Sequence, residues 1–230
     1  MHPRRPLVLV IAMVAACLAV AAFAAQNHCV LTIADVLDLE DVEDPRISPD
    51  GRTVLYTREW VDRMEDRWRS EIWTVNADGS RNRFLTRGSS PRWAPDGTRF
   101  AYLDDGEPEG TQVFVRWLDA AEPNQVTRVT AAPSSIRWSP DGSSIAFAMR
   151  VPADQGWEVD MPSPPEGASW TEPPRIVKGV YFRQDRRGFM EEGRLHLFVV
   201  DADGGTPRQL TDGPWNVGAR TYGLDDGVGF

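Results

Sequence analysis

The chain has 230 residues, with 34 acidic against 25 basic side chains and a formal net charge of −9 at pH 7. The phosphate backbone of a nucleic acid repels an acidic chain, so DNA and RNA are not expected as partners. With only three histidines and two cysteines in the sequence, we expect neither a metal site nor a cofactor.

The first 25 residues have the features of an export signal. Arg4 and Arg5 precede an apolar stretch from Leu7 to about Ala22, and small residues follow, which suit a signal peptidase. We expect residues 1–25 to be removed and the mature chain, residues 26–230, to be periplasmic or secreted. Its formal charge would then change from −9 to −11, because two arginines and no acidic residue are lost.

Three other interpretations of this segment stay open. Residues 14–17 resemble a lipoprotein box, the arginine pair resembles a twin-arginine signal, and an uncleaved apolar stretch would be a short membrane anchor. Contact with a membrane is expected only if Cys17 is lipidated or the signal is retained. If Cys17 is removed, Cys29 is the only cysteine and no intrachain disulfide can form.

One phrase occurs three times, about every 45 residues, which is the period of a propeller blade. Its copies are ISPDGRTVLY at 47–56, WAPDGTRFAY at 93–102 and WSPDGSSIAF at 138–147. Each copy predicts a strand, a tight turn and a second strand, because an apolar residue precedes the turn and an alternating apolar run follows it.

The turn residues of the phrase have distinct structural roles. Proline presets φ, aspartate can accept a hydrogen bond from its own backbone two residues on, and glycine adopts the left-handed conformation. The three aspartates also resemble a carboxylate cluster for acid–base work or calcium, but successive blades would hold them apart. We therefore predict structural turns at Pro49, Asp50, Gly51, Pro95, Asp96, Gly97, Pro140, Asp141 and Gly142.

A second hairpin completes each repeat. Residues 71–76 and 83–86 supply it in the first unit, 112–117 and 125–127 in the second, and 195–200 and 208–211 in the third. Asp104 is expected in a surface connection. Four short strands per period predict an all-β partial propeller of four-stranded antiparallel blades. Their expected bounds are about 43–87, 90–130 and 134–212, followed by an incomplete blade at 218–230.

The third unit is longer than the others because of an insertion at about residues 151–193. It is rich in proline and aromatic residues, which favours an ordered loop with extended pieces, and long loops of this kind are usually functional. Residues 222–230 resemble the start of a fourth copy of the turn phrase, with Leu224 in place of the proline, and the sequence stops inside the expected strand. Since a propeller needs about four to eight blades, we expect the chain to be a fragment of a longer protein.

The turn phrase, the Leu-Thr blade endings and the insertion sequence PPRIVKGVYFRQD at 173–185 together resemble a known family. They look like the N-terminal propeller of prolyl oligopeptidase family serine peptidases, in the acylaminoacyl-peptidase and dipeptidyl-peptidase-like branch. The turn phrase alone also resembles TolB-like periplasmic propellers, which bind other proteins.

The resemblance implies a non-catalytic propeller that controls which peptides reach an α/β-hydrolase domain. The catalytic residues of the family lie in that domain, so none is expected here, and the sequence contains no G-x-S-x-G motif. The implied partners are peptide substrates, through the missing hydrolase domain. A TolB-like propeller would instead have a protein partner.

Few side chains outside the turns are candidates for function. The resemblance implies that an acidic pair could hold a substrate's amino terminus, and Glu191 and Glu192 are such a pair, although a solvated acidic loop is the alternative. His196 is expected to be a structural histidine within a strand. The tryptophans Trp73, Trp93 and Trp138 are expected to pack the blades.

Overall fold

A computed structural model describes residues 31–120, 122–152, 162–171, 182–185, 188–189 and 193–218. Its regular structure is β-strand apart from one five-residue helix among these residues. The chain divides into two compact units, residues 1–40 with 60–69 and residues 41–59 with 70–230. The predicted signal segment, residues 1–25, and the predicted incomplete blade, apart from Gly218, lie outside the described residues.

In the smaller unit, a short helix accompanies the tip of a β-hairpin. The helix α2 (Ile33–Leu37) begins after Thr32, whose hydroxyl accepts a hydrogen bond from the Asp35 amide while the Asp35 carboxylate accepts one from the Thr32 amide. This reciprocal pair is a capping box, which satisfies amides that the first helical turn leaves without partners. In the hairpin tip, Arg63 forms an ion pair with Asp38.

The first four-stranded sheet contains β1 (Glu40–Ile47), β2 (Thr53–Asp62), β3 (Arg67–Asn76) and β4 (Arg83–Arg87). The second contains β5 (Ser89–Trp93), β6 (Arg99–Asp105), β7 (Thr111–Trp117) and β8 (Asn124–Gln125). The third contains β9 (Ser134–Trp138), β10 (Ser144–Val151), β13 (Arg194–Asp201) and β14 (Arg208–Gln209).

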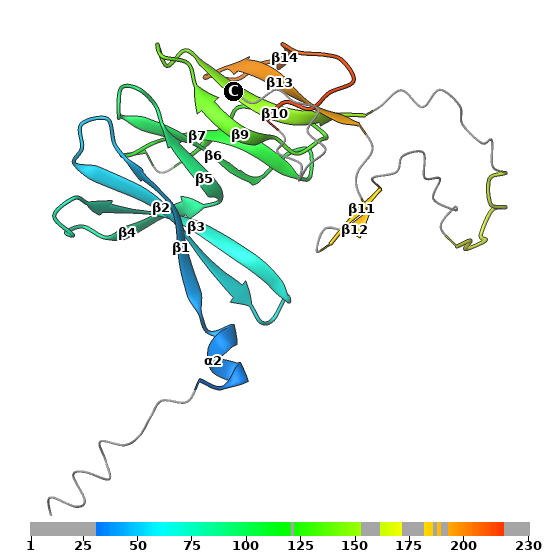
Figure 1. Cartoon of the computed structure of the whole chain (residues 1–230), viewed down its shortest axis with the longest axis horizontal. Helices are drawn as coiled ribbons and strands as arrows, with labels where there is room; N and C mark the ends of the chain where they lie inside the picture. Colours follow the sequence, from blue (N-terminus) through cyan, green and yellow to red (C-terminus); the bar gives the residue numbers. More distant parts are fainter. Residues whose placement is uncertain are drawn as a thin grey trace, which may run out of the picture. The chain divides into compact units, whose positions relative to one another are not determined.

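In each sheet, strands that follow one another along the chain pair side by side. In the third sheet, β10 pairs with β13, and the chain segment between these two strands lies outside the sheet. Figure 1 shows the three sheets following one another in colour, from blue through green to orange. The intervening segment contains a small hairpin of β11 (Arg183–Gln184) and β12 (Gly188–Phe189). These antiparallel four-stranded repeats confirm the predicted all-β fold, a partial propeller.

The second sheet packs on both of its neighbours because successive residues of β6 point to opposite faces. Phe100 and Tyr102 join one buried cluster with Leu55 and Ile72 of the first sheet. The alternate residue Ala101 joins another, larger cluster. It is shared with the third sheet and contains Val113, Val115, Val126, Ile136, Ile145, Phe147, Phe198 and Val200.

The fourth strands of the second and third sheets are shorter than the sequence pattern predicts. β8 ends at Gln125 and β14 at Gln209, because a threonine hydroxyl takes over one position of each backbone ladder. The Val113 amide donates to Thr127 Oγ1 at 2.9 Å, and the Leu197 amide donates to Thr211 Oγ1 at 2.9 Å. The side chain thus satisfies an amide that a longer strand would have paired.

Candidate functional site

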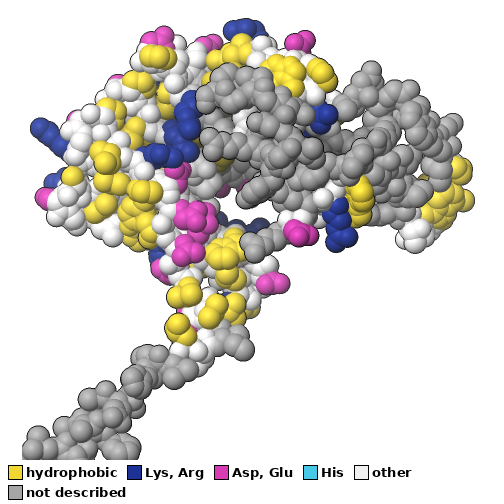
Figure 2. All heavy atoms as spheres, viewed as in Figure 1, with side chains coloured by type: hydrophobic (Ala, Val, Ile, Leu, Met, Phe, Trp, Pro, Cys, Tyr) yellow, Lys and Arg dark blue, Asp and Glu magenta, His cyan; other side chains and the backbone are white. Residues whose placement is uncertain are grey.

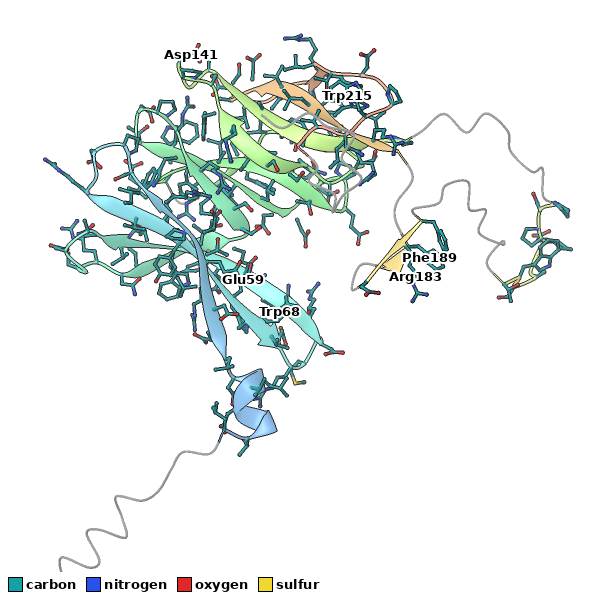
Figure 3. The ribbon with its side chains drawn as sticks, viewed as in Figure 1. Glu59, Trp68, Asp141, Arg183, Phe189 and Trp215 are labelled. Atoms are coloured by element: carbon teal, nitrogen blue, oxygen red, sulfur yellow. The ribbon has the colours of Figure 1, made fainter. Side chains whose placement is uncertain are left out.

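The aspartates of the three repeated turns are engaged in the turns themselves. Asp50 accepts from the Ser48 hydroxyl at 2.6 Å and from the Arg52 amide at 3.1 Å. Asp96 accepts from the Thr98 amide at 2.9 Å. Asp141, at the tip of its turn in Figure 3, accepts from the Ser139 hydroxyl and the Ser143 amide.

The hydrogen bonds of Asp50 and Asp141 favour the charged form of these two carboxylates. The Ser48 hydroxyl and then the Arg52 amide lower the pKa of Asp50. The Ser139 hydroxyl and then Ser143 lower the pKa of Asp141 to about 2. A carboxylate held in this way is a turn-building group rather than a proton donor or acceptor near neutral pH.

The prolines and glycines of the turns connect one sheet to the next. Gly51, Gly97 and Gly142 all have φ between 70° and 74°. A Cβ placed on Gly97 would lie 3.4 Å from Pro49 Cδ, and one on Gly142 would lie 3.5 Å from Pro95 Cδ. Gly97 and Gly142 therefore pack against the proline of the preceding turn, while Pro140 in the third turn is exposed.

The repeated tryptophans add a polar contact between sheets. Trp93 Nε1 donates to the Arg46 carbonyl at 2.9 Å, and Trp138 Nε1 donates to the Arg92 carbonyl at 2.9 Å. Trp73 packs edge-on against Phe84, with ring centroids 6.2 Å apart. All three tryptophans thus contribute to packing within or between the sheets.

Of the remaining candidate residues, the structure describes the histidine but not the acidic pair. Glu191 and Glu192 lie outside the described residues. His196 is 4% exposed in β13, where its Nδ1 lies 3.4 Å from Thr211 Oγ1 and its ring meets Trp215 edge-on. This environment is that of a packed histidine in a strand. No group of three or more metal-ligating side chains occurs among the described residues.

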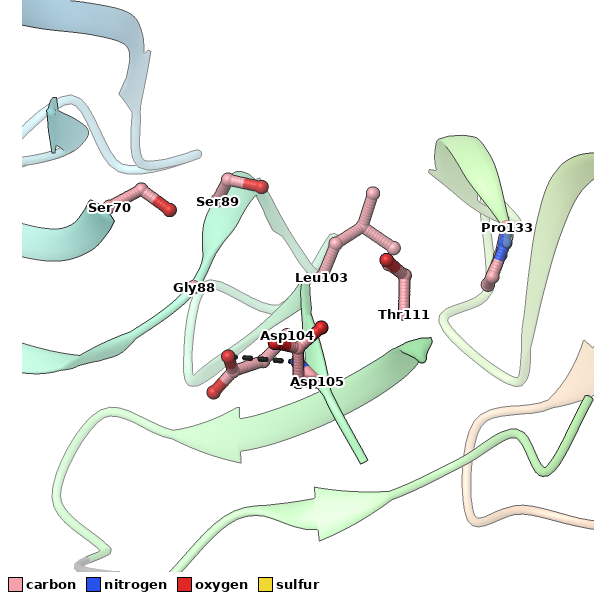
Figure 4. A pocket seen from close by; sticks show the side chains of 8 residues that line it. All are labelled: Ser70, Gly88, Ser89, Leu103, Asp104, Asp105, Thr111 and Pro133. Atoms are coloured by element: carbon pink, nitrogen blue, oxygen red, sulfur yellow. Dashed lines mark hydrogen bonds between the residues drawn. The ribbon is translucent and has the colours of Figure 1, made fainter. Parts of the chain in front are cut away.

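A polar pocket of about 330 Å³ in the larger unit is lined by residues of the first and second sheets and by Pro133, which precedes the first strand of the third sheet. Figure 4 shows Ser70 of β3 and Ser89 of β5, with Thr111 of β7 and Pro133 before β9 further along the pocket. The end of β6 adds Leu103 and the neighbouring carboxylates of Asp104 and Asp105, which complete the lining with Gly88.

Gly88 is needed for the backbone path along this pocket. Its φ is 114°, and a Cβ there would lie 2.5 Å from the Leu103 carbonyl oxygen and 2.7 Å from Tyr102 Cδ2. No side chain fits so close to a neighbouring strand. The residue joins β4 to β5, and its amide donates to the Ser70 carbonyl at 3.2 Å.

Asp104 is the titratable group of the pocket with a perturbed pKa. Burial raises its pKa, the hydrogen bond that it accepts from the Asp105 amide at 2.9 Å lowers it, and the Asp105 charge raises it further. Two adjacent carboxylates with three hydroxyls nearby suit a ligand group that donates hydrogen bonds or carries positive charge.

The sequence interpretation placed Asp104 in a surface connection, and this is wrong. Asp104 lies in β6 and is half-buried, because the antiparallel pairing of β6 with β7 continues through Asp104 and Asp105, opposite Gln112 and Thr111. The sequence signal was available in part: two acidic residues end an apolar strand. The other lining residues come from distant positions that no local pattern connects.

These features define a repeat protein of the propeller type, and comparisons with known proteins place it near peptidases. The chain is 27% identical over 199 residues to the uncharacterized peptidase YuxL of Bacillus subtilis, covering 85% of this chain and 30% of that protein. It is 36% identical over 87 residues to dipeptidyl-peptidase 5 of Porphyromonas endodontalis, covering 36% of this chain and 12% of that protein.

Among solved structures, the acylaminoacyl peptidase of Pyrococcus horikoshii superposes with a TM-score of 0.58 at 18% identity, covering 76% of this chain and 25% of that one. No protein-family model matches the chain. The predicted resemblance to the propeller of such peptidases is confirmed, since the homologues are peptidases. The chain spans about 30% of the length of the Bacillus relative. Within the described residues, no helix has the length and apolar character to cross a membrane.

Proposed function

We propose that this chain is the propeller portion of an exported peptidase of the prolyl oligopeptidase kind. In this proposal it selects the peptides that reach a separate α/β-hydrolase domain. The observation that carries the proposal is the similarity to the Bacillus peptidase, which extends over 85% of this chain but covers only 30% of that protein. The remainder of such a protein has room for the catalytic domain.

The chemistry of the described residues supports a selecting rather than a catalytic role for this portion. The turn carboxylates accept hydrogen bonds from their own turns, and His196 is buried against Trp215. A nucleophile and a base need to be accessible and within hydrogen-bond reach of each other. The sequence also has no G-x-S-x-G turn to present a serine.

The pocket at Asp104 is the described place best suited to contact a substrate. Its polar lining favours a cationic or hydrogen-bond-donating group over an apolar one. A peptide in contact with this pocket would be selected by its charge before it reached a catalytic centre elsewhere.

The test uses the longer protein, with its hydrolase domain, that this proposal predicts. We expect this protein to hydrolyse peptide substrates and a small chromogenic ester, with both activities lost on treatment with a serine-directed phosphonate. Asp104→Asn should alter kcat/KM for peptides and leave ester hydrolysis unchanged. Asp119→Asn, at an exposed position between β7 and β8, is the matched control.

Two results would overturn the proposal. One is a downstream sequence without a hydrolase domain, and the other is an Asp104→Asn variant whose kcat/KM for every peptide equals that of the Asp119→Asn variant. Export is tested separately by cell fractionation, in which the mature protein should appear outside the cytoplasm with its first residue near position 26.

A further inference from the structure

Three arginines occupy the same position in the three repeats of the sequence. Arg46, Arg92 and Arg137 each lie directly before the apolar residue that opens the repeated turn phrase. They are carried by β1, β5 and β9, the first strands of their sheets. All but one of the 25 basic residues of the chain are arginine.

The residue two positions before each arginine has an unusual backbone conformation. Asp44, Ser90 and Ser135 have φ values of 50°, 57° and 53°. Positive φ is uncommon for residues other than glycine. Its recurrence at the same place in three strands means that the local backbone around each arginine repeats as well.

In the first repeat, a carboxylate occupies this position and contacts two of the arginines. One oxygen of Asp44 pairs with Arg46 Nη2, and the other pairs with Arg92 Nη1 of the next sheet. A single carboxylate therefore bridges adjacent arginines of the series. The Trp93 hydrogen bond to the Arg46 carbonyl fixes the two strands at this point.

The next pair of arginines has the same framework but a different residue at the position equivalent to Asp44. Trp138 donates to the Arg92 carbonyl as Trp93 does to that of Arg46. Arg137 Nη1 donates to the Ile136 carbonyl as Arg92 Nη1 does to that of Pro91. The position equivalent to Asp44 is Ser90, which supplies a hydroxyl and no charge.

The charges of this series are unbalanced. Within the residues that the structure describes, Arg46 and Arg92 share Asp44, and no carboxylate forms an ion pair with Arg137. Arg92 Nε is buried and has no hydrogen-bond partner among the same residues. Burial lowers the pKa of Arg92, Asp44 opposes this, and the charges of Arg46 and Arg137 lower it further. Guanidinium groups keep their charge in proteins, so the excess is positive.

We propose that Arg92, Arg137 and Ser90 bind the carboxylate group of a ligand, at the place equivalent to the Asp44 carboxylate one repeat earlier. A carboxylate is favoured because Asp44 shows that this group fits between two arginines of the series, and the planar guanidinium matches it in geometry. The site is accessible: Arg137 is exposed, and Arg92 is 17% exposed.

The site stands on these internal repeats and does not depend on the proposed function. A peptide can supply the ligand carboxylate in two ways, through its carboxyl terminus or through the side chain of an acidic residue. Figure 2 shows that arginine and acidic side chains are interspersed with hydrophobic ones on the face that it views. The formal net charge of −9 makes an extended contact with a phosphate polymer less favourable than a contact with one carboxylate.

Calorimetric titration of the full chain at low ionic strength tests the site. The probes are an N-acetylated tripeptide with a free carboxyl terminus, its C-terminal amide, an amidated peptide with one central glutamate, and inorganic phosphate. We expect at least one carboxylate peptide to bind at least tenfold more tightly than the neutral amide, with affinity falling as salt is added. Whichever carboxylate peptide binds identifies the source. Equal binding of the amide, or preference for phosphate, would overturn the proposal.

Two substitutions at Ser90 provide a matched pair. Aspartate and asparagine both tolerate positive φ, so Ser90→Asp and Ser90→Asn differ mainly in charge. Ser90→Asp should reproduce the Asp44 bridge, abolish carboxylate binding and raise the melting temperature above that of Ser90→Asn at low salt. Ser90→Asn should still bind. Arg137→Gln, at an exposed position, should weaken binding at least tenfold; unchanged binding in Arg137→Gln or Ser90→Asp would contradict the site.

Discussion

Gly97 and Gly51 occupy the same place in two of the repeated turns, but their surroundings differ. Both have positive φ, so valine at either position strains the backbone. Only Gly97 also packs against a neighbouring turn, through Pro49. We expect Gly97→Val to lower the free energy of unfolding by about 1–3 kcal/mol, and Gly51→Val to lower it by less.

Urea denaturation of both variants measures this difference. Equal losses would mean that the contact between Gly97 and Pro49 contributes nothing beyond the strain that the two positions share.

The pKa of Asp104 predicts a stability that changes with pH. The pKa is raised in the folded state, so the fold prefers the protonated carboxyl, and this contribution decreases as pH rises from about 4 through the folded pKa. Asp104→Asn removes the buried charge and can still accept from the Asp105 amide. We expect this variant to melt at a higher temperature than the native chain at pH 7, with the gain shrinking toward pH 4.

The control for this prediction is Asp119→Asn, because Asp119 is exposed. Thermal melts of the three proteins between pH 4 and pH 8 provide the measurement. A gain for Asp104→Asn that is the same at every pH would show that the charge is not its origin.

The turn residues were predictable one by one because their chemistry is local. Proline, aspartate and glycine each shape the backbone within two residues of themselves, and the sequence shows them in order three times. The pKa of Asp104 was not predictable in the same way. It depends on how deeply the end of β6 is buried, and the pocket at this end is lined by residues far apart in sequence, including Ser70 and Pro133.

At the scale of the strands, the tryptophans before the turns connect neighbouring sheets. Trp138 Nε1 donates to the Arg92 carbonyl, and the Arg99 guanidinium carbon lies 5.1 Å from the centroid of the Trp138 ring. Phenylalanine keeps an aromatic six-membered ring and lacks the N–H group, so Trp138→Phe should lower the free energy of unfolding by at least about 1 kcal/mol, the usual value of one hydrogen bond.

Trp68→Phe is the control, because this tryptophan is 64% exposed and a surface change is usually worth less than about 0.5 kcal/mol. Denaturant unfolding distinguishes the two variants. If both lose the same small amount, the indole bond between β9 and β5 does not stabilise the fold.

The existence of the strands was predictable from the repeats, and some of their ends were not. Short apolar runs beside a turn signal, such as those of β6 and β10, indicate buried strands. The fourth strands end early because Thr127 and Thr211 use their hydroxyls in place of backbone groups, and a threonine in a strand pattern gives no sign of this choice. The arginine series was visible one residue before each repeated phrase, but its role depends on the contact between sheets that only the structure supplies.

At the scale of the whole molecule, the first strand of the first sheet has exposed apolar side chains. One of them lies at a repeat position whose residues are half-buried in the second and third sheets. Ile47 has the place that Trp93 and Trp138 occupy in the following repeats, and it is 68% exposed, with Val42 on the same strand 66% exposed. Exposed strands with apolar side chains favour pairing with other molecules. We therefore expect the 230-residue chain to associate as its concentration rises.

Light scattering across a dilution series measures this association, and two aspartate substitutions locate it. Ile47→Asp places a charge on the apolar strand and should shift association to higher concentration. Met64→Asp adds the same charge at a side chain that is 92% exposed in the hairpin tip, and should have a smaller effect. A native chain that stays monomeric throughout the series, with one sharp melting transition, would show that the exposed surface of β1 does not drive contact between molecules.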